Sequence, residues 1–152
     1  MRRFLERGGG WVAGQFVLFA CVFVLALWFR GTMGQAWRYC GAGLLVAGGV
    51  MAIFGARMHG RKLSPFPEPP DGGALIRRGI YGKIRHPLYT AVILAGLGWA
   101  LAWGSWSSAL AAAALIPFLH AKSLHEERLL REKFSDYREY EKTTKRFVPW
   151  LY

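Results

Sequence analysis

Two short groups of charged residues, far apart in the sequence, have the side chains needed to hold a charged small molecule. The first is Arg85-His86-Pro87, and the second is the acidic pair Glu126-Glu127. A guanidinium can grip a carboxylate or phosphate with two parallel hydrogen bonds, and a carboxylate can pair with a cation. A His can take up or release a proton near neutral pH. These residues predict either an internal ion pair or a site for a charged ligand.

The surroundings of the first group allow two interpretations. Residues 74–90 contain four cations, and basic residues beside a membrane segment commonly contact anionic lipids or set the topology. Pro87 is not explained in this way. It fits the first turn of a helix and leaves Arg85 and His86 in non-helical geometry, facing solvent or a ligand.

The acidic pair lies within two helical turns of the end of an apolar segment, near residue 121. Close to a bilayer surface, two carboxylates are costly unless they have a cationic partner. That partner could be Arg85 or Arg78, which would make the pair structural. It could equally be a positively charged ligand.

Apolar segments must position both groups. No formal charge occurs in the 36 residues from position 86 to position 121, and one helix of that length would reach about 54 Å, well beyond a hydrocarbon core of about 30 Å. The turn formers and Trp residues of segment 103–108 predict a tight hairpin, and Pro117 predicts a bend or a break in its second arm. We expect four spans, at about residues 11–29, 39–56, 88–103 and 107–121.

The distribution of cations predicts the topology. The net charge is +11 and the pI is near 10.3, but a mean hydropathy of +0.19 is too apolar for a nucleic-acid-binding domain. In the four-span arrangement 18 of the 20 Lys and Arg residues lie on one side, and only Arg30 and Arg38 lie on the other. The positive-inside rule then places both termini and the central loop in the cytoplasm. We expect no nucleic acid partner.

Two polar segments on the cytoplasmic side complete the predicted architecture. Segment 64–73 has four Pro within seven residues, so it is either a stiff linker or a loop that closes over a site. Segment 122–142 is predicted as an amphipathic helix that places Leu130, Phe134 and Tyr137 on one face with Glu127. The fold class is therefore an all-α integral membrane protein, with residues 1–152 as a single domain.

Other interpretations of single segments carry less weight. A signal peptide would compete with the first span, but the apolar stretch is long and no small-x-small cleavage site follows it. His120 and His125 are five residues apart rather than four, so they do not share a helix face as two ligands would, and no metal site is expected.

Four motifs taken in order resemble the isoprenylcysteine carboxyl methyltransferase and phospholipid methyltransferase family. They are Gly79-Ile-Tyr81, Arg85-His-Pro-Leu-Tyr89, Glu126-Glu127 and Arg146-Phe-Val-Pro149, with Leu130, Phe134, Tyr137 and Tyr140 spaced between the last two, and the resemblance spans roughly residues 73–149. It implies binding of S-adenosylmethionine at the cytoplasmic face of a helical bundle. The implied cofactor contacts are Leu75, Ile76, Tyr81, Arg85, His86, Leu88, Tyr89, Glu126 and Glu127.

The resemblance also implies roles for these residues. Arg85 would bind the cofactor's carboxylate and Glu126 its ammonium, while His86 is a candidate base for acceptors that must lose a proton. Lys122 and Arg146 are candidates for acceptor binding. Lys122 stands where the eukaryotic prenylcysteine enzymes have Arg, and an ammonium cannot reproduce a bidentate grip, so their acceptor is not carried over.

The implied activity is methyl transfer to a lipophilic or small acceptor, through a carboxylate, amine or thiol. Membrane lipids and the acceptor are the expected partners, with a homo-oligomer as an open possibility and a prokaryotic inner membrane as the expected location. Two alternatives remain. One is an NADPH-binding membrane reductase with sterol-reductase-like architecture, and the other is a non-catalytic membrane partner protein.

Overall fold

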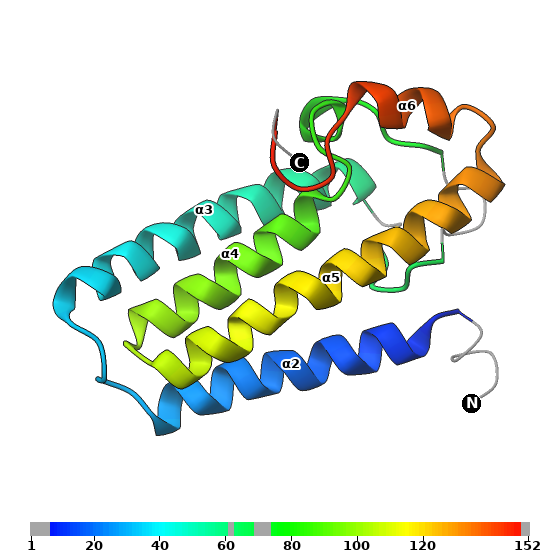
Figure 1. Cartoon of the computed structure of the whole chain (residues 1–152). Helices are drawn as coiled ribbons and strands as arrows, with labels where there is room; N and C mark the ends of the chain where they lie inside the picture. Colours follow the sequence, from blue (N-terminus) through cyan, green and yellow to red (C-terminus); the bar gives the residue numbers. More distant parts are fainter. Residues whose placement is uncertain (1–6, 61–62, 69–73, 150–152) are drawn as a thin grey trace.

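The structure is a computed structural model that describes residues 7–60, 63–68 and 74–149. Within these ranges the chain is helical and contains no strand, as the sequence predicts. Figure 1 shows the elements, which are α2 (Gly9–Trp28), α3 (Gln35–His59), the short 3₁₀-helix η2 (Gly79–Gly82), α4 (Pro87–Ala102), α5 (Trp106–Lys133) and α6 (Tyr137–Thr143).

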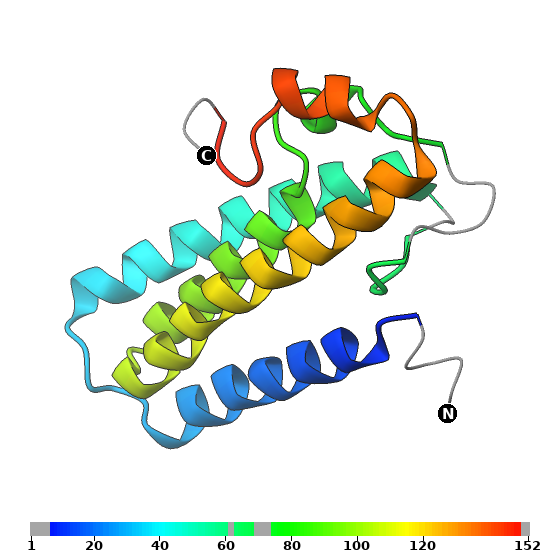
Figure 2. The ribbon, with the colours of Figure 1, turned by 45° about the vertical axis from the view of Figure 1, so that its right-hand side comes forward.

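Four of these helices lie side by side as a bundle. In Figures 1 and 2, α4 runs between α3 and α5, and α2 lies along α5. Helices α2, α3 and α5 are long and apolar enough to cross a membrane. Helix α4 is apolar but has 16 residues, which corresponds to about 24 Å. The chain is therefore a membrane protein with three candidate spans in the described part, and a fourth span at α4 remains a prediction.

Glycines bring α3 and α4 into close contact. Gly41, Gly48 and Gly55 are buried, and their seven-residue spacing places them on one helix face. A Cβ added to Gly48 would lie 2.9 Å from the carbonyl oxygen of Ala91, closer than a side chain tolerates. Small residues at such positions let membrane helices approach backbone to backbone. This contact fixes the level at which α4 begins beside the end of α3.

The predicted hairpin between the last two apolar segments is present. Gly104 adopts a left-handed conformation with φ 67°, which glycine tolerates without strain. Ser105 then caps α5 by accepting a hydrogen bond from the Ser108 amide. The Ser105 hydroxyl donates to the Leu25 carbonyl, and the Ser108 hydroxyl donates to the Val22 carbonyl. These bonds also fasten the hairpin to α2.

Helix α5 is longer than predicted. It continues without a break through Pro117 and past the end of the apolar segment at residue 121. Packing inside a helix bundle lets membrane helices tolerate the lost proline hydrogen bond. The 12 residues 122–133 extend about 18 Å beyond the apolar part and lie outside the membrane-spanning segment.

The prediction of one amphipathic helix over residues 122–142 is wrong. Its first half is the end of α5, the chain turns at Phe134, and α6 is a separate helix of seven residues. Ser135 and Asp136 follow Phe134, and both residue types favour turns and caps over helix interiors. Arg131 on α5 holds the turned-back helix through a two-pronged salt bridge to Glu141.

Candidate functional site

The motif before α4 is held in an extended conformation by the C-terminal segment. The amide of Arg85 donates to the Lys145 carbonyl at 2.8 Å, and the amide of His86 donates to the Arg146 carbonyl at 3.0 Å. The Lys145 amide in turn donates to the Lys83 carbonyl at 3.0 Å. This short parallel pairing joins segments about sixty residues apart and orients the side chains of both.

The helix that follows begins as the sequence predicts. His86 is the N-cap of α4, with φ −122° and ψ 57°, and Pro87 occupies the first helical turn. Just upstream, Gly79 has φ 62° and packs against Met58 on α3, which explains the glycine. The next turn buries Tyr81, whose carbonyl accepts a hydrogen bond from the Tyr140 hydroxyl at 2.6 Å.

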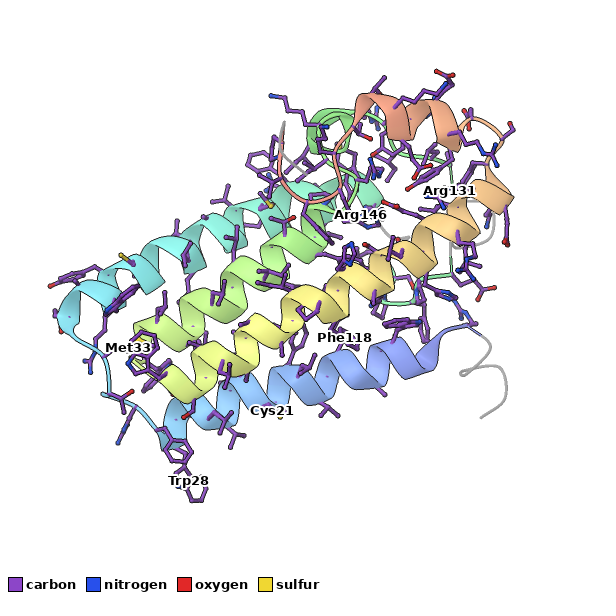
Figure 3. All side chains as sticks on the ribbon, in the orientation of Figure 1. Cys21, Trp28, Met33, Phe118, Arg131 and Arg146 are labelled. Atoms are coloured by element: carbon purple, nitrogen blue, oxygen red, sulfur yellow. The ribbon has the colours of Figure 1, made fainter. Side chains whose placement is uncertain are left out.

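Glu127 is the electrostatic centre of this region. Its side chain is 0% exposed and accepts hydrogen bonds from Arg85 Nε at 2.9 Å, Arg146 Nη2 at 2.6 Å and His86 Nε2 at 3.1 Å. Arg131, one helical turn along, lies 3.6 Å away. Figure 3 shows Arg131 and Arg146 at the end of the bundle where α6 crosses. One buried carboxylate thus binds three segments together.

These donors determine the ionisation of Glu127. Burial alone would raise its pKa, but hydrogen bonds from His86, Arg146 and Arg85 favour the charged form and hold the pKa well below its usual range. The carboxylate is therefore ionised whenever the region is folded. A charge that is fully committed to internal partners acts as an anchor rather than as a ligand-binding group.

Arg85 is only partly used by the protein. Its Nη1 donates to the Thr144 carbonyl at 2.6 Å and to the Glu141 carbonyl at 3.4 Å, while Nε donates to Glu127. Among the described residues none accepts a hydrogen bond from Nη2. The side chain is 10% exposed and faces a cavity, so the guanidinium keeps one donor edge for another group.

Glu126, the other member of the acidic pair, faces the same cavity. Its side chain is 26% exposed and accepts a hydrogen bond from the Tyr89 hydroxyl at 2.5 Å. His86 Nδ1 lies 3.8 Å away, and the His86 ring stacks on the Tyr89 ring. Adjacent residues on a helix differ in direction by about 100°, so Glu127 points into the protein while Glu126 points towards the cavity.

The cavity lies between the end of α3, the end of α5, helix α6 and the two connecting segments that precede α4. Its volume is about 310 Å³, within the range of small-molecule sites. Its walls combine aromatic rings with a few charged groups. The lining residues are Met58, His59, Ser64, Phe66, Pro67, Glu68, Ala74, Leu75, Ile76, Tyr81, Arg85, His86, Glu126, Leu130, Phe134, Tyr137 and Tyr140.

The structure brings together six of the residues implied by the sequence resemblance. Leu75, Ile76, Tyr81, Arg85, His86 and Glu126 all line the cavity. The region implied by the resemblance starts at Gly73, which lies outside the described residues. The cavity wall therefore combines three groups that are separate in the sequence. They are the apolar dipeptide Leu75-Ile76, the basic motif with Arg85 and His86, and Glu126 of the acidic pair.

The other five candidates lie around the cavity rather than in its wall. Leu88 packs against Gly55 on α3. Tyr89 supports Glu126 and His86, and Glu127 is the buried anchor described above. Arg146 lies behind the wall, bound to Glu127, with His120 Nε2 at 3.1 Å from its Nη1.

Lys122 holds the proline-rich segment in place. Its ammonium is buried and donates to the Pro65 carbonyl at 2.9 Å and to Gln15 Oε1 at 2.7 Å. On the other side of the segment, Arg7 pairs with Glu68 at 3.1 Å and lies over the Phe66 ring. The structure describes residues 64–68 of this segment, and four of them, Ser64, Phe66, Pro67 and Glu68, line the cavity.

Sequence reasoning missed much of the aromatic wall. The residues not proposed as ligands include Met58, His59, Phe66, Phe134, Tyr137 and Tyr140. The last three did stand out as aromatic residues spaced along the C-terminal segment. The spacing of Phe134 and Tyr137 was interpreted as one helix face, and the turn at Phe134 brings all three residues to the cavity.

Comparison with known proteins gives one finding. A search of curated proteins finds no match. The sequence model of a family described as phospholipid methyltransferase matches residues 36–137, which is about two thirds of the chain and includes α3, α4, α5 and most of the cavity wall. The chain therefore belongs to the phospholipid methyltransferase family.

Proposed function

We propose that this protein transfers a methyl group from S-adenosylmethionine to a lipophilic acceptor at the cytoplasmic face of a membrane. The observation that carries the proposal is the pair of opposite charges in one cavity. Arg85 has an unused Nη2 donor edge, and Glu126 has a partly exposed carboxylate. An amino acid moiety, with its carboxylate and its ammonium, is complementary to this arrangement.

The rest of the cavity also fits the cofactor. Tyr81 and Phe66 provide aromatic faces against which an adenine can pack. Leu75 and Ile76 contribute an apolar wall beside them. A volume of about 310 Å³ lies within the range of small-molecule sites, and the mixed aromatic and charged lining offers partners for both the nucleoside and the amino acid part of the cofactor.

When bound, S-adenosylmethionine would supply a methyl group attached to a positively charged sulfur. An acceptor in line with the carbon–sulfur bond can take this methyl group, and the sulfur then leaves as a neutral thioether. The protein's own part is to orient the reactants and keep water out. Arg85 and Glu126 fix the amino acid end, and residues 64–68 of the proline-rich segment contribute to the cavity wall. Both ring nitrogens of His86 face carboxylates, Nε2 towards Glu127 and Nδ1 towards Glu126, so His86 positions these acids.

A groove in the bundle favours a lipophilic acceptor. It has a volume of about 200 Å³ and is lined almost entirely by apolar atoms of α2, α4 and α5, among them Val22, Val92 and Trp99. Tyr89, Val92 and Trp99 follow one another at three- and seven-residue spacings on α4, so they share one helix face, on which Tyr89 contacts Glu126 and the other two residues line the groove. An acyl or prenyl chain could lie there while its reactive group meets the cofactor.

The proposed orientation places the cavity in the cytoplasm. Eighteen of the 20 cations lie on the side that carries both termini and the loop before α4, which is the side the positive-inside rule assigns to the cytoplasm. A prokaryotic inner membrane is the location we propose.

Binding of the cofactor is the first test. The purified protein is titrated calorimetrically with S-adenosylmethionine and, separately, with NADPH. We expect binding of the first compound and none of the second, and the reverse result would support the reductase alternative. Methyl transfer is then measured with labelled cofactor and total membrane lipids, and binding without any labelled product would favour the non-catalytic alternative.

Matched variants connect the binding to the cavity. Arg85→Lys keeps the positive charge beside Glu127 but removes the Nη2 edge, and Glu126→Gln removes the open carboxylate. We expect each to weaken binding about tenfold or more, the size of a lost hydrogen bond to a charged group. Arg131→Lys is the control, because Arg131 also contacts Glu127 but does not line the cavity. Equal losses in all three variants would contradict the assignment.

A further inference from the structure

The hydroxyl of Tyr137 is buried without a hydrogen-bond partner. The residue is 1% exposed, and no described residue donates to or accepts from its Oη. The side chain lines the cavity. A buried hydroxyl with no hydrogen-bond partner destabilises a folded protein. Because the Tyr137 side chain lines the cavity, a molecule bound in the cavity could supply the missing partner.

Neighbouring tyrosines make the contrast clear. The Tyr140 hydroxyl donates to the Tyr81 carbonyl at 2.6 Å, and the Tyr89 hydroxyl donates to Glu126 at 2.5 Å. Elsewhere in the described part of the chain, Arg38 Nε and Trp99 Nε1 are also buried without a partner, but neither residue lines this cavity. Among the described residues, Tyr137 alone combines both properties.

The position of Tyr137 relates its hydroxyl to Arg85. Tyr137 is the first residue of α6, one turn before Glu141, and the Glu141 carbonyl accepts a hydrogen bond from Arg85 Nη1 at 3.4 Å. The guanidinium therefore lies against the same short helix. Its Nη2, like the Tyr137 hydroxyl, has no acceptor among the described residues. The wall thus presents two unused donors from neighbouring elements.

We propose that the Tyr137 hydroxyl and Arg85 Nη2 together bind the carboxylate of the cofactor's amino acid moiety. A carboxylate has two oxygens and accepts from two donors at once, and charge-assisted hydrogen bonds of this kind are the strong ones. Glu126 is then left for the ammonium. The inference rests on the proposed function and adds to it a ligand-binding role for Tyr137, which the family resemblance includes without giving it a role.

The protonation state of Tyr137 is consistent with this role. Burial, followed by the negative charge of Glu127, raises the pKa of Tyr137 well above its ordinary value, while the charge of Arg85 acts in the opposite direction. The hydroxyl keeps its proton at physiological pH. It is a donor, as a carboxylate partner requires.

The test is the variant Tyr137→Phe, which removes one oxygen and keeps the ring. Affinity is measured by calorimetry for two probes, S-adenosylhomocysteine and 5′-methylthioadenosine, which lacks the amino acid carboxylate and ammonium. We expect the affinity for S-adenosylhomocysteine to fall about tenfold or more and that for 5′-methylthioadenosine to stay unchanged. Tyr39→Phe is the matched control, since Tyr39 is exposed on α3.

Thermal unfolding without ligand provides the second readout. Because the hydroxyl has no internal partner, Tyr137→Phe should unfold at the wild-type temperature or above it. A clear fall in that temperature would mean that the hydroxyl has a structural role and would overturn the proposal. Equal losses for both probes would overturn it too, because the contact would then be to the nucleoside, and so would unchanged affinity for S-adenosylhomocysteine. Wild-type protein that binds neither probe would instead refute the proposed function itself.

Discussion

Replacing Glu127 by Gln tests whether one buried carboxylate holds the site together. The substitution keeps the shape of the side chain and removes its charge. Arg85, Arg146 and His86 would then lose their shared counter-ion while remaining almost completely buried, since the side chains of the two arginines are 10% and 14% exposed. Arg131 is less affected, because it is 37% exposed and has Glu141 as a second partner.

The expected cost follows from these contacts. Removing one partner of a buried ion pair typically destabilises a protein by about 3–5 kcal/mol, because a buried charge is left uncompensated. A glutamine oxygen can still accept from one arginine, but its NH₂ group would face another donor. Arg146 Nη2 is only 2.6 Å from the replaced Oε2. We therefore expect Glu127→Gln to lower the free energy of unfolding by about 3–5 kcal/mol. For a chain of this size, this corresponds to a fall of about 6–20 °C in unfolding temperature.

The assay combines thermal unfolding in detergent with hydrogen exchange. Glu127 connects α5 to the segment 145–146 and to the motif before α4, so protection should be lost first in α6 and in the pairing of residues 83–86 with 145–146. The glycine-packed contact between α3 and α4 should stay protected. The control is Glu139→Gln, because Glu139 pairs with Lys142 at the surface and such pairs contribute about 0–1 kcal/mol.

One result would refute this reasoning. If Glu127→Gln unfolds at the wild-type temperature and retains full protection of the C-terminal segment, the three cations do not depend on Glu127. The carboxylate would then have to be a ligand-binding group, and its loss would appear only in cofactor affinity.

The remaining predictions concern acid stability and helix packing. Folding lowers the pKa of Glu127, so the contribution of its charge to stability is present above the unfolded pKa of about 4.3 and is lost as the pH falls through the lower folded pKa. Below about pH 4, the unfolding temperature of the wild type should therefore fall more steeply than that of Glu127→Gln. Parallel curves of unfolding temperature against pH would contradict this. Gly48→Ala should lower the unfolding temperature, because the new Cβ would lie 2.9 Å from the Ala91 carbonyl oxygen. The control is Gly43→Ala, whose new Cβ would have no atom within 4 Å. It should leave the unfolding temperature unchanged or raise it, because alanine is more favourable than glycine in a helix by about 0.5–1 kcal/mol. Equal shifts in the two glycine variants would show that the α3–α4 approach is not tight.

The apolar helices were predictable because their signal is local. A long run of apolar residues without charges specifies a membrane helix almost regardless of what surrounds it, and α2, α3 and α5 lie where the composition places them. Segment 103–108 predicted the hairpin through its turn formers, and Pro87 predicted the start of α4 through its fixed backbone angle. Each of these features depends on residues within a few positions of one another.

The C-terminal region was not predictable in the same way. Residues 122–142 have one continuous amphipathic pattern, yet the chain divides it at Phe134, because Arg131 and Glu141 pair across the turn and α6 packs back. For the proline-rich segment the sequence allowed two interpretations, and the contacts of Lys122 with Pro65 and of Arg7 with Glu68 place its described residues 64–68 at the cavity wall. Contacts between residues far apart in the sequence made both decisions.

The sequence by itself determined that this is a helical membrane protein with charged motifs at one end, and the order of those motifs indicated the methyltransferase family. Only the tertiary structure decided how the charges are used. The pairing of residues 83–86 with 145–146 turns Arg85 towards both Glu127 and the cavity, and a rotation of about 100° between neighbouring residues buries Glu127 while leaving Glu126 open. The sequence determines the helical periodicity, but tertiary packing determines which face of the helix points towards the cavity.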